Sequence, residues 1–263
     1  MSEEIRSRVG RLDIPWNQYG IDPYGTARDD LVWFFEAARA LYRSYFHVQS
    51  FGFENVPARG RAMLVGNHSG GVALDGLMLI AAVFLEMDPP RLAQAMIEKF
   101  LAHVPFASPL LSRVGQLTGL PEHVVRLLRD ERLLLVFPEG ARGTAKLFWK
   151  RNSLVQFGTG FMRLALQTGT PIVPFGFVGG GLAIPTIANS YKLGRLLGAP
   201  YVPLTPWLLP VPLPVRLAVR FGPAMHFEGS GNEDDASIEE KVEQVKERIR
   251  QLIGVGLEGL KSA

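Results

Sequence analysis

Short apolar runs bounded by glycine, proline or charged residues alternate along the chain with longer stretches of mixed polarity. The runs at 61–65, 133–137 and 171–178 have the length and composition of strands buried on both faces. The alternating segment 215–221 predicts a further strand with one polar face. Strands separated by helical stretches indicate an α/β fold. We therefore expect a single domain with a mostly parallel central sheet flanked by helices.

Helical patterns fill the intervals between these strands. Apolar periodicity and terminal signals predict helices at 74–86, at about 91–101, at 121–128, at 153–167 and, with Ser237 as its cap, at 237–253. A short strand is also expected near 48–53 and another near 115–117.

The N-terminal region follows a different pattern. Residues 1–25 are rich in Pro, Gly, Asn and Asp and predict an irregular arm. The next segment, within 26–50, predicts a helix with aromatic side chains on much of its circumference. That is broader than the stripe a helix needs to pack on a core, so we expect an amphipathic interfacial helix. Residues 51–254 then form the α/β domain.

Charge is distributed unevenly along the chain. The 28 basic and 25 acidic residues give a formal net charge of +3. The span 141–227 contains no Asp or Glu and carries nine bases, so the rest of the chain carries 3 − 9 = −6. The bases are Arg142, Lys146, Lys150, Arg151, Arg163, Lys192, Arg195, Arg216 and Arg220. Such a span either faces anions or pairs with acidic residues from elsewhere. Nucleic acid is the least favoured partner, because the span holds a Pro-rich apolar loop and no recognised motif.

Two uncharged stretches, at 164–191 and 196–215, raise the question of a membrane. Both contain too many prolines for a spanning helix, and no signal peptide is expected at the N-terminus. The second stretch predicts either a buried connection or a loop that enters the lipid headgroups. We expect a monotopic or peripheral protein on the cytoplasmic face of a membrane with anionic lipids. The predicted membrane contacts are Trp33, Phe34, Phe35, Tyr201 and Trp207.

The segment 65–76 carries the first candidate chemistry. His68 follows a predicted strand, and Asp75 enters the next predicted helix after a Ser-Gly-Gly loop. Ligands bind at the carboxyl ends of parallel strands, and a carboxylate beside one imidazole nitrogen leaves the other as a general base. One continuous helix would separate the two residues by about 10.5 Å along its axis. A pair therefore requires that the loop bend back; the alternative is a histidine that caps a helix.

The segment 137–146 forms a second candidate loop after another buried strand. Glu139 and Arg142 lie three residues apart on a predicted tight turn. The arginine fork binds phosphate or carboxylate in a two-point manner. Glu139 is expected to orient Arg142 or to hold an acceptor hydroxyl, and the alternative is a structural Glu–Arg turn.

The two segments together resemble the lysophospholipid/glycerolipid acyltransferase superfamily. The resemblance rests on Asn67-His68 followed by Asp75 and on 137–142, Phe-Pro-Glu-Gly-Ala-Arg, and it extends from about 52 to 223. It implies that His68 deprotonates an acceptor hydroxyl with Asp75 as its partner. It also implies that the acceptor is held by Glu139, Gly140, Arg142 and Lys146, with Asn67 and Lys99 in support.

The same resemblance implies a substrate pair and no bound cofactor or metal. The donor would be a fatty acyl thioester of CoA or acyl carrier protein, and the acceptor a glycerolipid or lysophospholipid. Two departures widen the range of acceptors. Six residues separate His68 from Asp75 where the family has four, and Pro121 stands where the family has a phosphate-binding arginine. The stretch 142–151 looks closer to the monoacylglycerol/diacylglycerol acyltransferase-like branch.

Several functions therefore stay open at this point. The acceptor is either lysophosphatidate or a neutral glyceride or other alcohol. A thioesterase or lipase-type hydrolase would use the same His–Asp pair with water. A non-catalytic lipid-binding protein would keep the fold with a widened His68–Asp75 spacing.

Overall fold

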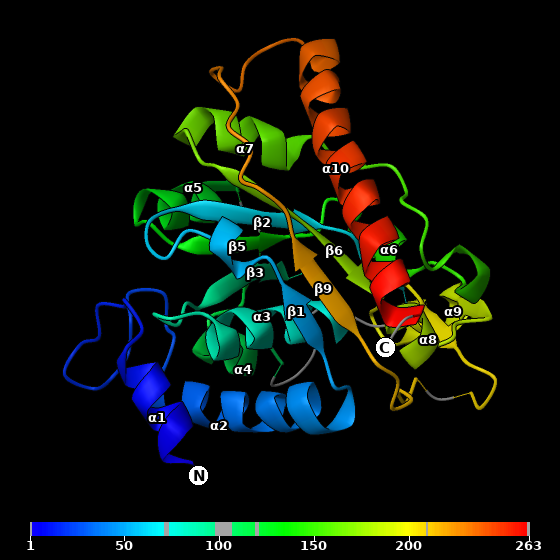
Figure 1. The fold of residues 1–263 in the computed structure, drawn as a ribbon, viewed down its shortest axis with the longest axis horizontal. Helices are drawn as coiled ribbons and strands as arrows, with labels where there is room; N and C mark the ends of the chain where they lie inside the picture. The colour runs from blue at the N-terminus through cyan, green and yellow to red at the C-terminus, as the bar shows by residue number, and fades with distance from the viewer. Residues whose placement is uncertain (1, 71–73, 98–106, 119–120, 209, 262–263) are drawn as a thin grey trace.

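The computed structural model describes residues 2–70, 74–97, 107–118, 121–208 and 210–261. Within them a seven-stranded sheet forms the centre, in the order β1-β9-β6-β2-β5-β3-β4 (Figure 1). The pair β6–β9 is antiparallel, and the other neighbours run parallel. The expected α/β domain with a mostly parallel sheet is confirmed. The strands are β1 (Gln49–Phe51), β2 (Ala62–Gly66), β3 (Ala93–Ile97), β4 (Leu117–Thr118), β5 (Leu133–Val136), β6 (Ile172–Val178) and β9 (Ala218–Phe221).

The apolar runs become central strands because helices cover both faces of the sheet. Every residue of β2 and β6 is buried, and Met63 pairs with Ile172 while Leu64 pairs with Val173. Successive side chains of β2 enter opposite cores: Leu64 belongs to one apolar cluster and Met63 to the other.

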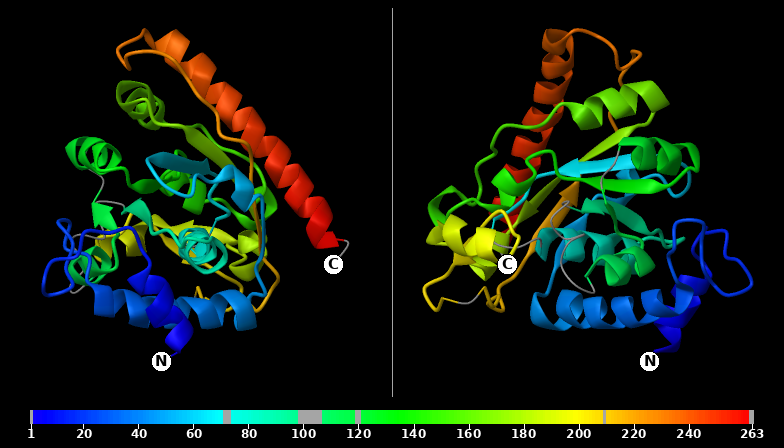
Figure 2. Two further views of the ribbon diagram at one scale, coloured as in Figure 1. Left: turned by 60° about the vertical axis from the view of Figure 1, so that its left-hand side comes forward. Right: turned by 180° about the vertical axis from the view of Figure 1, so that it is seen from behind.

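Each apolar cluster is closed by its own helices. The cluster around Leu64 includes side chains of α1 (Glu3–Gly10), α2 (Arg28–Arg39) and α3 (Leu74–Glu86). The cluster around Met63 includes side chains of α5 (Pro121–Arg129), α7 (Gly160–Thr168) and α10 (Asp235–Lys261). Figure 2 shows α2 and α10 on opposite sides of the sheet. The expected helices at 74–86 and 121–128 are confirmed.

Between β6 and β9 the chain leaves the sheet and forms a small lobe, drawn mainly in yellow at one corner of the molecule (Figures 1 and 2). It contains the end of α8 (Gly180–Ala183), the helix α9 (Tyr191–Leu196) and the antiparallel pair β7 (Ala188–Ser190) and β8 (Val202–Leu204). We call the described residues of this part of the chain, 182–208 and 210–213, the 182–213 lobe. The remaining named helices are α4 (Ala107–Arg113) and α6 (Ala141–Thr144), with a π-helix (Ala40–Tyr45) directly after α2 and 3-10 turns at Phe53–Asn55 and Phe148–Lys150.

Two of the expected helices differ from the structure: one contains a strand, and the other begins later than expected. Of the helix expected at 91–101, positions 98–101 lie outside the described residues. Within the rest the structure has β3, because this apolar segment pairs with β5 and β4 and buries Ala93 in the core. The expected helix at 153–167 starts only at Gly160, because Ser153 closes a turn by donating to the carbonyl of Lys150. In the first region tertiary contacts override local helical composition, and in the second a local turn precedes the helix.

The two chain ends also differ from expectation. The expected irregular arm at 1–25 contains α1, which Ser2 caps and which buries Ile5 and Val9 completely. At the other end, α10 starts at Asp235 and continues to Lys261. Asp234, not Ser237, lies in the capping position, since its carboxylate accepts hydrogen bonds from the backbone N–H and hydroxyl of Ser237.

The aromatic helix α2 packs on the protein more closely than an interfacial helix would. Phe35 is fully buried and stacks on Phe84 of α3, with ring centroids 3.6 Å apart. The expectation that Phe35 contacts a membrane is therefore wrong, and Phe34 is partly buried against the same core. Trp33 is 65% exposed. Within the described residues, no helix combines the length and apolar character needed to cross a bilayer.

Candidate active site

His68 and Asp75 form a buried pair where β2 ends and α3 begins. The imidazole Nδ1 lies 3.1 Å from Oδ1 and 3.0 Å from Oδ2 of the carboxylate. The Asp75 side chain is 0% exposed and also accepts hydrogen bonds from the backbone N–H groups of Ser69 at 2.9 Å and Gly76 at 2.8 Å. The two side chains are therefore in contact despite the wider spacing between them in the sequence.

The His68 ring is fixed in orientation as well as in position. The Phe137 ring stacks on it with centroids 3.9 Å apart and an interplanar angle of 9°. Because Nδ1 faces the carboxylate, the neutral ring carries its proton there and leaves Nε2 as the nitrogen that can accept a proton. The sequence pattern gave no reason to assign Phe137 this role, since it appeared only as the end of a predicted strand and the first residue of the second motif.

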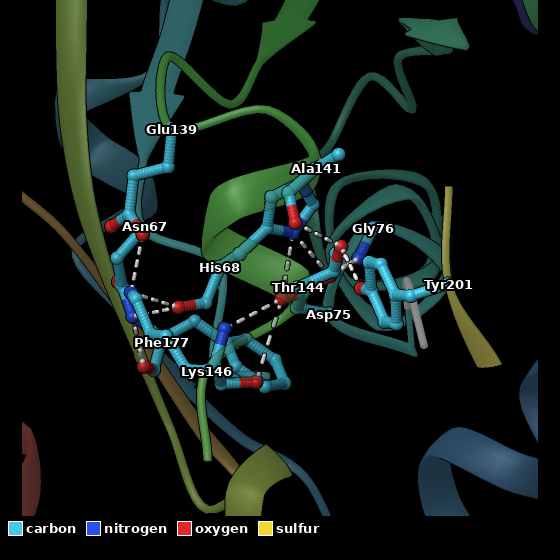
Figure 3. A network of polar contacts seen from close by, with 11 residues as sticks. Asn67, His68, Asp75, Gly76, Glu139, Ala141, Thr144, Lys146, Phe177 and Tyr201 are labelled. Carbon is cyan, nitrogen blue, oxygen red and sulfur yellow. Dashed lines mark hydrogen bonds and ion pairs between the residues drawn. The ribbon is translucent and has the colours of Figure 1, made fainter. Parts of the chain in front are cut away.

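Asn67 fastens the loop to the neighbouring strand. Its side-chain amide donates to the carbonyl of Phe177 at 2.9 Å, and its side-chain oxygen accepts from the N–H of Phe177 at 2.8 Å. This two-point bond ties the end of β2 to β6 immediately before His68 (Figure 3). The sequence-based expectation of a supporting role for Asn67 thus has a concrete geometry: it positions the backbone that carries the histidine.

Glu139 and Lys146 form a second buried pair, which lies against the first. Their side chains are 0% and 2% exposed, and the Lys146 ammonium contacts Glu139 Oε2. The same ammonium donates to the backbone carbonyl of His68 at 2.7 Å (Figure 3). Burial raises the pKa of Glu139 and lowers the pKa of Lys146, while each charge opposes the shift of the other. Among the described residues, Glu139 Oε1 has no hydrogen-bond partner.

Arg142 lies apart from this buried pair. It is exposed and donates to the side chain of Gln156 at 3.5 Å, so the expectation that Glu139 orients Arg142 is wrong. Lys146 takes that place because the chain folds back after the short helix α6, whose N-cap is Gly140 with φ 54° and ψ −150°. Arg142 remains open to a ligand. Lys99, expected in support, falls outside the described residues.

Gly143 is a site residue that sequence reasoning passed over. A Cβ at this position would lie 2.6 Å from the Cβ of Glu139 and 2.8 Å from the Cβ of His68. The absence of a side chain therefore lets α6 approach both buried pairs. The signal was present in the sequence, as a glycine directly after Ala141-Arg142, but only the packing shows why it is needed.

Among the described residues, no group of three or more His, Asp or Glu side chains is arranged to hold a metal ion. The chemistry of the site is that of a positioned imidazole with a carboxylate partner and an exposed arginine nearby. In an α/β fold, a histidine at the carboxyl end of a parallel strand with a buried carboxylate on Nδ1 is arranged for general base catalysis.

The chain belongs to the Acyltransferase family, whose model matches residues 47–178. That range contains both buried pairs. Over 255 residues, or 92% of this chain, it is 32% identical to uncharacterised proteins of Mycobacterium leprae and Mycobacterium tuberculosis, and it covers 67% and 69% of their respective lengths.

Two further similarities are to proteins whose names state an activity. A human DGAT1/2-independent enzyme synthesizing storage lipids is 24% identical over 164 residues, which are 62% of this chain and 49% of that protein. The crystal structure of the 1-acyl-sn-glycerophosphate (LPA) acyltransferase PlsC from Thermotoga maritima matches with a TM-score of 0.54 at 18% identity. The match covers 86% of this chain and 82% of that one. It supports the same fold.

Proposed function

We propose that this acyltransferase works at a membrane and moves a fatty acyl group from a thioester of CoA or acyl carrier protein to a hydroxyl of a glycerolipid or lysophospholipid. The observation that carries the proposal is the contact of His68 Nδ1 with both oxygens of the buried Asp75, inside the segment that matches the family.

The proposed reaction needs one base and one acid, and His68 serves as both in turn. Nε2 accepts the proton of the acceptor hydroxyl while the oxygen attacks the thioester carbonyl. The tetrahedral adduct then expels the thiolate, which takes that proton from the imidazolium, so the products are an ester and a thiol. Asp75 stabilises the imidazolium between the two steps. A positioned base of this kind contributes about 10²–10⁴-fold to the rate.

Two classes of acceptor are supported, one by the surroundings of the site and one by a relative. The exposed guanidinium of Arg142 suits an acceptor phosphate, such as that of lysophosphatidate. The storage-lipid activity named for the human relative supports a neutral glyceride instead. We therefore propose that the acceptor belongs to one of these two lipid classes.

An acyl-transfer assay with labelled oleoyl-CoA tests the proposal. Thiol release and ester formation are measured with lysophosphatidate, monoacylglycerol, diacylglycerol or lysophosphatidylcholine, and without acceptor. We expect thiol release to rise with one acceptor class and to match ester formation. His68→Ala should lower the rates of thiol release and ester formation by about 10²-fold or more. His123→Ala, which changes an exposed histidine, should leave both rates unchanged.

Three outcomes would contradict the proposal. Equal thiol release with and without acceptors indicates hydrolysis, in which water takes the place of the lipid hydroxyl. Full activity of His68→Ala would mean that another group acts as the base. No turnover by the wild-type protein with either CoA or acyl-carrier-protein donors would favour a lipid-binding protein that has lost catalysis.

A further inference from the structure

The 182–213 lobe carries most of the exposed large apolar side chains of the described residues. Ten of the seventeen large apolar side chains that are exposed in the described residues lie within it. Within the lobe, the largest exposures are those of Leu196 at 81% and Leu208 at 72%. Apolar surface gathered in one short segment marks a contact with another partner, since single exposed apolar residues are otherwise scattered.

Charge and side-chain type on the lobe indicate which partner this is. Lys192 and Arg195 are exposed on α9 beside Tyr191 and Leu196, and the whole span 141–227 contains no acidic residue. Trp207 is also exposed. Apolar side chains interleaved with bases, with Tyr and Trp among them, suit the boundary between anionic headgroups and acyl chains. The surface would repel a basic protein partner.

The lobe is bonded directly to the segment that holds the active-site lysine. The backbone N–H of Phe148 donates to the carbonyl of Thr186 at 2.7 Å, and the side chain of Asn189 donates to the carbonyl of Ala145 at 2.7 Å. Tyr201 donates its hydroxyl proton to Thr144. Tyr201 is therefore buried at 9% exposure and acts as an anchor of the lobe; the expectation that it contacts a membrane is wrong.

We propose that the 182–213 lobe, and not the aromatic helix α2, is the surface that docks on an anionic lipid bilayer. This inference rests on the proposed function, because it places the membrane next to the loop that holds His68. On α2, Trp33 is the widely exposed aromatic residue, and Phe34 and Phe35 face the core. The lobe thus supplies the apolar contact that α2 lacks.

Binding of the full-length protein to lipid vesicles tests the docking surface without any catalysis. The vesicles are phosphatidylcholine alone or a mixture with phosphatidylglycerol, and bound protein is measured by co-sedimentation. Leu196→Ser combined with Leu197→Ser should weaken binding by about tenfold or more, because the variant lacks two leucine side chains that would move from water into the bilayer. Trp33→Ser is the matched control and should bind like the wild-type protein.

A charge variant separates the two components of binding. Lys192→Gln combined with Arg195→Gln should weaken binding to the phosphatidylglycerol mixture and leave binding to phosphatidylcholine unchanged. Raising the salt concentration should release only part of the wild-type protein, because apolar contacts are not screened. All substituted side chains are exposed, and a thermal unfolding curve for each variant confirms that it is folded.

Acyl transfer to a short-chain, monomeric acceptor keeps the two proposals distinguishable. The double variant Leu196→Ser/Leu197→Ser should acylate this acceptor as fast as the wild-type protein does. It should be slower only with acceptors that are embedded in vesicles. If no acceptor is acylated, the proposed function fails while the vesicle result still decides the docking surface. The assignment would be overturned if the double leucine variant bound vesicles like the wild-type protein, or if Trp33→Ser lost as much vesicle binding as that variant. Self-association of the wild-type protein without vesicle binding would also overturn it.

Discussion

The ammonium group of Lys146 donates a hydrogen bond to the backbone carbonyl of His68 at 2.7 Å, across 78 positions of sequence. This bond fastens the loop after β5 to the loop after β2. Lys146 also contacts the buried carboxylate of Glu139, so one cation serves both loops. The same segment is bonded to the 182–213 lobe through Ala145 and Phe148. The histidine, the second motif and the apolar lobe therefore form one connected unit.

Removal of the Lys146 charge should destabilise the protein strongly. Lys146→Met leaves Glu139 buried without its cation, which costs about 3–5 kcal/mol of unfolding free energy. Urea unfolding followed by circular dichroism measures this loss at pH 7. Lys146→Met combined with Glu139→Gln should recover part of it, because no unpaired charge remains. A single variant as stable as the wild-type protein would contradict the role assigned to the pair.

A methyl group at Gly143 should disturb the site. In Gly143→Ala the new Cβ would lie within 3 Å of atoms of Glu139 and His68, so these side chains must shift. We expect a stability loss of about 1–3 kcal/mol and, since a displacement of about 1 Å in an active site can cost about 10²-fold, a large fall in kcat.

Gly160→Ala is the matched control for this substitution. Gly160 is the first residue of α7, and a Cβ there meets no atom within 4 Å. Stability and kcat of this variant should remain close to those of the wild-type protein. Equal behaviour of the two alanine variants would show that the close approach at Gly143 is not important.

Loss of the Asn67 amide should lower the stability of the end of β2. In Asn67→Ala the buried N–H and carbonyl of Phe177 each lose their hydrogen-bond partner. Each unsatisfied group should lower the free energy of unfolding by about 1–3 kcal/mol. Differential scanning calorimetry should show a lower Tm. The exposed Asn232→Ala serves as the control and should leave Tm unchanged; a Tm of Asn67→Ala equal to that of the control would refute the bracing role.

The contact between α1 and α2 should be sensitive to acid. Hydrogen bonds from Ser2 and then from Arg39 lower the pKa of Glu36 from 4.5 to about 2. A lowered folded-state pKa adds stability that is fully present above pH 4.5 and is lost as the pH falls toward 2. Wild-type protein should therefore have a higher Tm than Glu36→Gln at pH 6, and the difference should shrink at pH 3. A difference that stays constant over this range would contradict the assignment.

The sequence alone determined the elements whose apolar pattern matches their final environment. The strands near 61–65, 133–137 and 171–178 are buried on both faces, so a continuous apolar run was sufficient to predict them. The sequence offered His68 and Asp75 as a candidate pair, and their side chains are in contact in the structure. These features depend on neighbours in the chain, which a sequence shows directly.

The tertiary structure decided whatever depends on contacts between distant segments. The segment of β3 has helical composition and becomes a strand because β5 and β4 offer it hydrogen bonds on both sides. Phe35 is buried because α3 lies against α2, and Lys146 pairs with Glu139 because the chain folds back after α6. Burial and charge pairing are properties of a packed arrangement. For this reason the sequence could supply candidate site residues, while only the fold could show how they are held.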